Sequence, residues 1–330
     1  MDDKIQTRKS HGVQRVLEKL ESSIKKGNYY EAHQMYRTLY FRYSTQKKYS
    51  ELFQLLYDGA ILLLKHDQQV SGCDLANLYA EVLVKTETAP SQELFFKIST
   101  LLEMISADVA EREVFLDNAL RWSASGGQEY KNGHPLLHQA VAQVFWKEKN
   151  YVVARYHFLH STDGVSFANM LIELHCARGF ACEVDLFIAQ VVLQYLCLQN
   201  KNTATLAFQS YTKHHPSINK GPPYLLPLLN FIWFLLKTIE SGKLAAFTLL
   251  CEQYQGSIKR DPTYRDYLDK IAQIFFGVPP PHKAKNSGFL GNLFQSLMNG
   301  VDEFESDDDN SSTSARPSTS TQHMETEALD

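Results

Sequence analysis

Histidine and cysteine are the residue types in this sequence whose spacing could support chemistry. His134 and His138 stand four positions apart, which lets two imidazoles on one helix face share a metal ion. No Glu follows the first of them, as the His-Glu-x-x-His motif of metalloproteases requires. Two other groups lack a paired Cys-x-x-Cys or a third ligand at usable spacing: His157 with His160, and His175 with Cys176 and Cys182. We therefore expect core residues here and no metal site.

Motifs that bind nucleotides or carry a catalytic nucleophile are absent from the sequence. It has no Gly-x-x-x-x-Gly-Lys-Ser/Thr loop, no Gly-x-Gly-x-x-Gly turn and no Gly-x-Ser-x-Gly elbow. The acids Asp108, Glu111 and Glu113 suit the start of a helix, where negative charge meets the helix dipole. We expect a protein that is not an enzyme, uses no cofactor and presents its surfaces to other proteins.

Length and composition predict a globular protein with a large core. The chain has 330 residues, 44% of them apolar and 12% aromatic, and a domain of about 300 residues buries roughly three-quarters of its unfolded surface. Residues 1–48 hold 11 Lys and Arg against 5 Asp and Glu, whereas residues 301–330 hold 9 acids and one base. A pI near 6.3, with acids interspersed in the basic front, argues against a nucleic-acid partner.

Cysteine usage and hydropathy predict a protein of the cytosol. The five cysteines are odd in number and four of them lie in apolar helical runs, which indicates reduced thiols. No apolar segment follows the first four residues, so we expect no signal peptide. The longest apolar stretch, residues 224–236, is broken by Pro227 and Asn230 and is shorter than the roughly 20 residues of a membrane span. We interpret it as a buried helix.

Apolar residues recur at helical spacing in nearly every window up to residue 276. They do so over residues 13–24, and Gly27 follows as a stop signal. Asn28 has Glu31 three positions on, the spacing of a capping box, so a second helix is expected to start there. Such a short link forces the two helices to pack antiparallel.

The same periodicity predicts about fourteen helices and no competing strand-rich segment. Ser91, just after Pro90, is expected to cap one helix, and Pro135 suits the first turn of another. The polar, glycine-bearing loop at residues 123–133 is a candidate hinge between two halves. Residues 183–199 are apolar on two faces, which predicts a central helix.

A repeated pattern distinguishes a solenoid from a bundle. It consists of an aromatic residue, a small residue three positions on and a second aromatic four further on. The two copies are Tyr29, Ala32 and Tyr36, and Tyr151, Ala154 and Phe158. We therefore expect an all-α fold: an alpha-solenoid of about seven stacked antiparallel helix pairs, similar to tetratricopeptide repeats, with a disordered C-terminal tail. A chance coincidence of two helix starts is the alternative.

The chain is expected to divide into five segments. A short amphipathic patch in the fourth is expected to dock back or to bind a partner; it contains Phe289, Leu290, Leu293, Phe294, Leu297 and Met298. The segments are a flexible terminus at 1–9, helical-repeat halves at 10–122 and 134–276, an extended segment at 277–305, and a disordered acidic, Ser/Thr-rich tail at 306–330.

Several stretches in the same order resemble the Golgi-to-ER traffic protein four family. They are GNYYEAHQMYRT at 27–38, RYHFLHS at 155–161, LNFIWFLL at 229–236, FFGVPP at 275–280 and LGNL at 290–293. The resemblance spans residues from about 12 to 298. It implies a non-catalytic scaffold in the delivery of tail-anchored membrane proteins to the ER, which bridges the targeting ATPase to a ubiquitin-like adaptor or, in animals, a Scythe-type quality-control scaffold.

In that family the N-terminal helices dock on the ATPase, so the basic front of this chain is expected to do so. Arg and Tyr are frequent interface anchors, although a solvated helix face is the alternative for any single residue. The candidates are Arg15, Lys19, Lys25, Lys26, Tyr29, Tyr30, Arg37 and Arg42.

The C-terminal half is expected to hold the adaptor or scaffold, around the Pro-rich connection at residues 211–226. Acids nearby would complement a basic partner segment. The candidates are Tyr211, Pro216, Pro222, Pro223, Tyr224, Trp233, Glu240, Glu252, Asp266 and Asp269. Two alternatives stay open: a helical-repeat subunit of another assembly, such as the proteasome lid or signalosome, and an enzyme with a helical fold.

Overall fold

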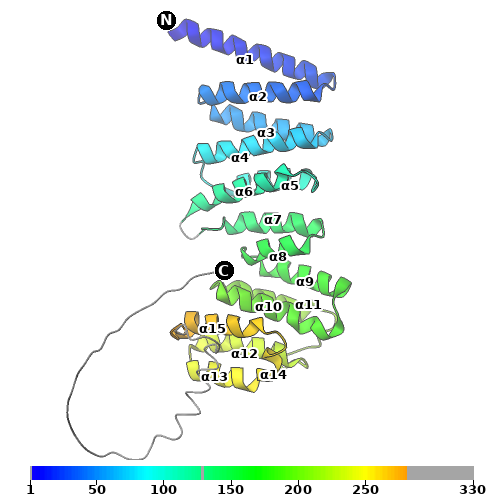
Figure 1. The fold of residues 1–330 in the computed structure, drawn as a ribbon, viewed down its shortest axis with the longest axis vertical. Helices are drawn as coiled ribbons and strands as arrows, with labels where there is room; N and C mark the ends of the chain where they lie inside the picture. Colours follow the sequence, from blue (N-terminus) through cyan, green and yellow to red (C-terminus); the bar gives the residue numbers. More distant parts are fainter. Residues whose placement is uncertain (1, 128–129, 281–330) are drawn as a thin grey trace, which may run out of the picture. The chain divides into compact units, whose positions relative to one another are not determined.

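The computed structural model describes residues 2–127 and 130–280, with side chains from residue 12 onward. This part of the chain forms fifteen α-helices and two short 3₁₀ turns and has no strand, which confirms the all-α class (Figure 1). The helices are α1 (Asp2–Lys25), α2 (Tyr29–Thr45), α3 (Tyr49–Lys65), α4 (Gln69–Lys85), α5 (Gln92–Met104), α6 (Glu111–Ser123), α7 (Pro135–Lys147), α8 (Tyr151–Leu159), α9 (Gly164–Arg178), α10 (Val184–Cys197), α11 (Lys201–His214), α12 (Pro227–Ser241), α13 (Leu244–Gln253), α14 (Gln255–Ile258) and α15 (Thr263–Phe276).

The helices stack in antiparallel pairs, as the repeated pattern predicts. Within the compact unit of residues 1–279, α1 packs on α2, α3 on α4 and α7 on α8. Contacts between α2 and α3, α5 and α7, and α8 and α9 join one pair to the next (Figure 1). This arrangement confirms the alpha-solenoid.

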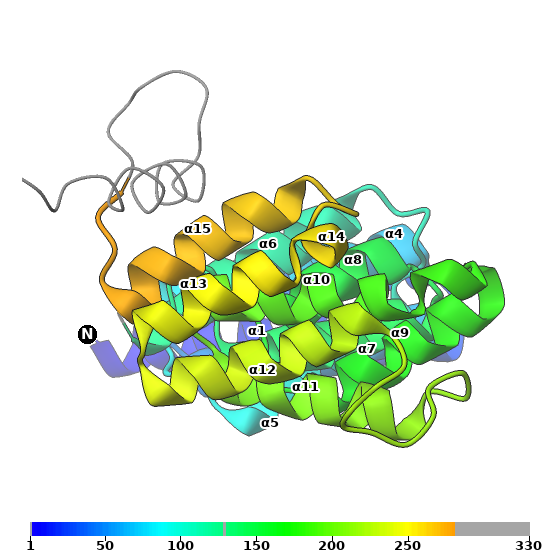
Figure 2. The same ribbon diagram turned by 90° about the horizontal axis from the view of Figure 1, so that it is seen from below.

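Helix α10 is the centre of the C-terminal half, as its two apolar faces predict. It packs against α8, α9, α11, α12 and α15. Helix α15 therefore contacts a helix that lies some 70 residues earlier in the chain. Figure 1 shows α12 to α15 grouped at one end of the stack, and Figure 2 views the molecule from that end. A break at Tyr254 separates α13 from the short helix α14.

Helix starts follow the sequence signals with one exception. The Leu94 amide donates to Ser91 Oγ over 3.4 Å, and Pro135 occupies the first turn of α7. The capping box at Asn28 is wrong, because the Asn28 side chain makes no cap bond. Glu31 turns away to accept a hydrogen bond from Ser23 Oγ at 3.0 Å.

The small residues of the repeated pattern lie where helices approach closely. Ala32 and Ala154 are fully buried, and the second aromatics, Tyr36 and Phe158, are buried with them. A Cβ atom on Gly59 of α3 would lie 2.5 Å from the Tyr36 ring, so α2 and α3 are in close contact there. The repeated pattern therefore reflects close helix packing and is not a chance coincidence of two helix starts.

Some of the expected segment boundaries stay predictions. Helix α1 begins at Asp2, inside the segment 1–9 for which a flexible terminus is expected. Across the loop at 123–133, α5 packs on α7. The amphipathic patch at 289–298 and the tail at 306–330 lie outside the described residues. None of the described helices is both long and apolar enough to cross a membrane.

Candidate protein-docking surface

A basic stripe runs along the exposed face of α1. Arg15 and Lys19 are one turn apart, and Lys26, just past the helix end, falls within about 40° of them at 100° per residue. Around the helix axis, Lys25 lies about 80° from Arg15. All four are exposed, whereas Val13 and Leu20 are buried beneath them. The structure therefore brings four of the expected docking residues together.

Two aromatic side chains stand on the exposed face of α2. Tyr30 is 77% exposed and Phe41 is 60% exposed, and their separation of eleven residues places them on the same face. Arg37 lies between them. Our sequence analysis missed Phe41, although its spacing from Tyr30 was a usable signal. Exposed aromatic residues beside an arginine are typical anchors of protein interfaces.

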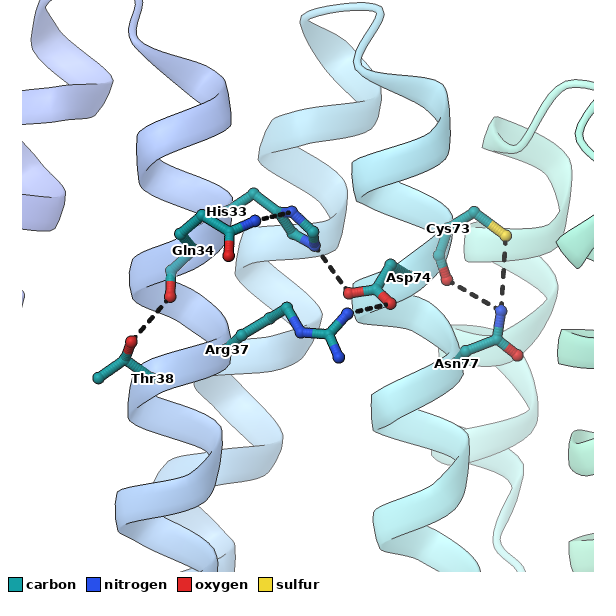
Figure 3. A network of polar contacts seen from close by, with 7 residues as sticks. All are labelled: His33, Gln34, Arg37, Thr38, Cys73, Asp74 and Asn77. Carbon is teal, nitrogen blue, oxygen red and sulfur yellow. Dashed lines mark hydrogen bonds and ion pairs between the residues drawn. The ribbon is translucent and has the colours of Figure 1, made fainter.

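An ion-pair network joins this face of α2 to α4. His33 Nε2 contacts Asp74 Oδ2 at 2.7 Å, and Arg37 donates to Asp74 Oδ1 at 2.9 Å (Figure 3). Burial acts to raise the pKa of Asp74, but the His33 hydrogen bond and the Arg37 charge outweigh it, so the pKa lies below its usual value. The charged form is therefore favoured. With 30% of the side chain exposed, the Asp74 carboxylate is accessible to a partner.

Further hydrogen bonds around this network run within each helix. On α2, Gln34 contacts His33 Nδ1 at 3.5 Å and accepts from Thr38 at its carbonyl. On α4, Asn77 donates to the Cys73 carbonyl at 3.2 Å (Figure 3). Sequence analysis missed His33 and Asp74 because they are 41 residues apart and only the packing of α2 on α4 brings them together.

Two of the expected docking residues, Arg42 and Tyr29, also make contacts within the stack. Arg42 is half-buried and donates to the Gly12 carbonyl at 2.5 Å, which fixes α1 on α2. The Tyr29 ring stacks on His66 with 4.7 Å between centroids. These contacts hold both side chains within the stack, and their part in docking stays a prediction.

The connection between α11 and α12, residues 215–226, forms an exposed excursion. Pro216, Pro222 and Pro223 are exposed, and Leu225 is 82% exposed. Asn230 fixes the end of this segment at Tyr224. Its side-chain oxygen accepts from the Tyr224 backbone amide and its side-chain nitrogen donates to the Tyr224 carbonyl, both at 2.7 Å. Four of the expected C-terminal residues are thus held in one ordered segment.

Tyr211 and Asp269 cannot meet a partner as expected. Tyr211 is fully buried, and its hydroxyl donates to the Val184 carbonyl at 2.8 Å; burial raises the pKa of this phenol. Asp269 is 8% exposed. We correct both assignments, since charge and residue type alone do not show which helix face is buried.

The remaining C-terminal candidates are at or near the surface. Trp233 is half-buried, with its ring centroid 4.6 Å from that of Phe234. Glu240 pairs with Lys237 at 3.2 Å, Glu252 is half-buried, and Asp266 is exposed.

The paired histidines of α7 and α8 belong to the core, as expected. His138 and His157 contact each other through their Nδ1 atoms at 2.8 Å, and His138 Nε2 contacts the Asn132 carbonyl at 3.0 Å. Burial lowers the pKa of His138 to about 4 and that of His157 to about 3. Both rings are therefore neutral at physiological pH. His175 is buried as well, and the fold places His215 against it, a neighbour that the sequence did not indicate. Cys176 and Cys182 were expected in the core with it, but both are exposed, so that expectation is wrong.

The fold defines a class: an alpha-solenoid of stacked helix pairs with extended exposed helix faces. The sequence profile of the family described as Golgi to ER traffic protein 4 matches residues 46–298. The chain belongs to this family.

Individual relatives agree with that assignment, and a solved structure shares the fold. The Golgi to ER traffic protein 4 homolog of Xenopus tropicalis is 52% identical over 297 residues, which cover 90% of this chain and 91% of the relative. The human homolog is 52% identical over 292 residues, covering 88% and 89%. The crystal structure of C. therm. Get4 superposes with a TM-score of 0.75 at 24% identity, over 90% of this chain and all of that one. This last similarity concerns the fold.

Proposed function

We propose that this chain is a non-catalytic, cytosolic scaffold in the delivery of tail-anchored membrane proteins to the ER. Membership of the Golgi to ER traffic protein 4 family carries the proposal. In this role the surface on α1, α2 and α4 docks the targeting ATPase. The C-terminal half holds a ubiquitin-like adaptor or a Scythe-type quality-control scaffold.

The composition of the α1–α4 surface supports the first contact. Arg15 and Lys19 give it positive charge, which speeds the encounter with an acidic partner. Tyr30 and Phe41 supply large apolar contacts that an exposed helix face does not need for folding. The Asp74 carboxylate adds one fixed negative charge, so a complementary partner must place a basic residue opposite it.

The connection at 215–226 supports the second contact. It is twelve residues long, longer than most links of the stack, and it exposes three prolines and Leu225 while Asn230 fixes its end. An exposed segment with a fixed backbone loses less conformational entropy on binding than a flexible segment does. No observation favours a subunit of the proteasome lid or signalosome, since the described residues hold no strand-bearing winged-helix module.

Charge reversal at the basic stripe tests the ATPase contact. We expect Arg15→Glu with Lys19→Glu to slow association and to weaken ATPase binding at least about tenfold at low salt. Affinity of the unchanged chain should fall steeply as salt rises, because exposed charges are screened. Both partners are titrated against each protein at low and high salt, and adaptor binding should persist.

A matched control separates the surface from net charge. Lys243→Glu with Lys259→Glu alters net charge by the same amount at exposed positions in the C-terminal half. It should leave ATPase binding unchanged. Unchanged ATPase affinity in the Arg15/Lys19 variant, or equal loss of both partners, would show that the docking surface lies elsewhere.

A further inference from the structure

Two histidines and a cysteine meet where α9 and α11 end. His175 is in the last turn of α9 and is 6% exposed, His215 is the residue that caps α11 and is 3% exposed, and Cys176 is exposed. Packing of α9 on α11 brings together residues 40 positions apart. One nitrogen from each ring and the Cys176 Sγ atom all lie within 4.8 Å of one another. No other such trio of His, Cys, Asp or Glu occurs in the described residues.

Hydrogen bonds fix the orientation of both rings. His175 Nε2 donates to the Phe180 carbonyl at 2.9 Å, which leaves the Nδ1 lone pair directed at His215. His215 Nδ1 accepts from the Ser217 amide at 3.1 Å, so Nε2 carries the ring proton and donates it to His175 Nδ1 at 3.0 Å. A backbone carbonyl on the far nitrogen of His175 is the outer contact typical of metal-binding histidines.

We propose that His175 Nδ1, His215 Nε2 and Cys176 Sγ form a zinc site. Imidazole and thiolate are the ligands that Zn²⁺ prefers, and tetrahedral zinc with Zn–N bonds of about 2.0–2.1 Å holds two nitrogens about 3.3 Å apart. The two nitrogens here are 3.0 Å apart, and Cys176 Sγ lies within 4.8 Å of both, so the exposed thiol has to move closer to complete the site. Because Cys176 is at the surface, water or a partner side chain takes the fourth position.

Zinc binding at this site requires that two protons leave the ligand atoms. The Cys176 thiol proton is released to solvent. The His215 ring proton moves from Nε2 to Nδ1, where the bond from the Ser217 amide gives way. This local cost makes the affinity moderate. The site would join the end of α9 to the first residue of the connection at 215–226, and the inference does not depend on the proposed partners.

Cobalt and zinc titrations of the tag-free full chain test the site. We expect one equivalent of Co²⁺ to give tetrahedral absorption with a sulfur-to-cobalt charge-transfer band, and Zn²⁺ to displace it. Cys176→Ser should abolish that band and weaken cobalt binding at least about tenfold. Cys182→Ser is the matched control, since Cys182 is also exposed but stands outside the cluster.

Thermal melting gives a second readout that does not depend on the spectrum. Zinc should raise the melting temperature of the unchanged chain and of Cys182→Ser, and leave Cys176→Ser unaffected, because only a folded-state site stabilises on binding. Cys176 is exposed, so serine there should not disturb folding. No saturable binding at one equivalent, or equal behaviour of the two serine variants, would overturn the proposal and leave the histidines as a hydrogen-bonded link between helices.

Discussion

The ion pairs at two levels of the stack use the same residue types in opposite settings. On α2 and α4, Arg37 holds Asp74 with 41% of the arginine side chain exposed. Between α6 and the end of α7, Arg112 binds Glu148 through both terminal nitrogens, and the Arg112 side chain is 7% exposed. The Arg112 Cζ atom lies 5.3 Å from the centroid of the Phe145 ring. The first pair can exchange its partner for another protein's charge. The second is tied to the fold, because Arg112 is buried, although the Glu148 side chain is 30% exposed.

The difference shows how one solenoid separates binding from stability. Exposed pairs contribute little to folding, since water and salt screen them. A buried charge that loses its partner costs several kcal/mol. The central region should therefore determine stability, and the α1–α4 surface should be open to changes that alter partners. Four predictions test this contrast.

The largest effect is expected at Glu148. Glu148→Gln removes the charge that neutralises buried Arg112 and should lower the free energy of unfolding by about 3 kcal/mol. Its neighbour Lys147 is the matched control, because it forms an exposed pair with Glu103 at 2.8 Å. Lys147→Gln should cost less than about 0.5 kcal/mol. Urea unfolding measures both, and equal losses would remove the contrast.

Acid should destabilise the central region through His138 and His157. Their pKa values, about 4 and about 3, lie below the ordinary value near 6.5, so the unfolded chain binds more protons as pH falls. Stability is complete above about pH 7.5 and should drop by about 3 kcal/mol by about pH 5.4, since each ring contributes about 1.4 kcal/mol for each pH unit below 6.5. Loss of the stability linked to Asp74 begins only at lower pH, because its pKa is depressed from an already acidic value.

Urea unfolding between pH 7 and pH 4.5 measures this dependence. His157→Gln removes one titrating ring and should flatten the profile. His160→Gln, at a half-buried neighbouring position, should keep the steep profile. A flat profile in the unchanged chain would mean that the rings are protonated without cost.

The small residues of the repeat should be sensitive in both regions. Ala32→Leu and Ala154→Leu add three carbons at fully buried positions and should each destabilise by about 1–3 kcal/mol through overpacking. Gly256→Ala is the control, since a Cβ there meets nothing within 4 Å. Thermal melts compare the three. Neutral behaviour at Ala32 alone would show that the N-terminal pair is loosely packed.

The architecture could be predicted because helical spacing is a local signal. The apolar steps of three and four, Ser91 and Pro135 marked helices correctly, and the apolar faces of residues 183–199 placed α10 at the centre. Local signals failed at Asn28, where Ser23 competed for Glu31.

The candidate surface was predictable only in part. Exposed basic residues of α1 follow from one helix wheel, so Arg15 and Lys19 could be named. Contacts between helices could not: Asp74 against Arg37 and His215 against His175 depend on packing across 37 and 40 residues. Burial of Tyr211 is likewise decided by α10, which faces it.

The smallest effect on stability is expected at Arg37. Its guanidinium is 41% exposed, and Asp74 keeps the His33 hydrogen bond if Arg37 is removed, so Arg37→Ala should cost less than about 1 kcal/mol. Partner binding should respond more, because the variant removes a charge from between Tyr30 and Phe41. Arg121→Ala, at an exposed arginine in the last turn of α6, is the control for loss of one positive charge. Urea unfolding and ATPase titration are measured on the same samples. A large loss of stability with unchanged binding would mean that the His33–Asp74–Arg37 network holds α2 to α4, as Arg112 does deeper in the stack, and is not part of a docking surface.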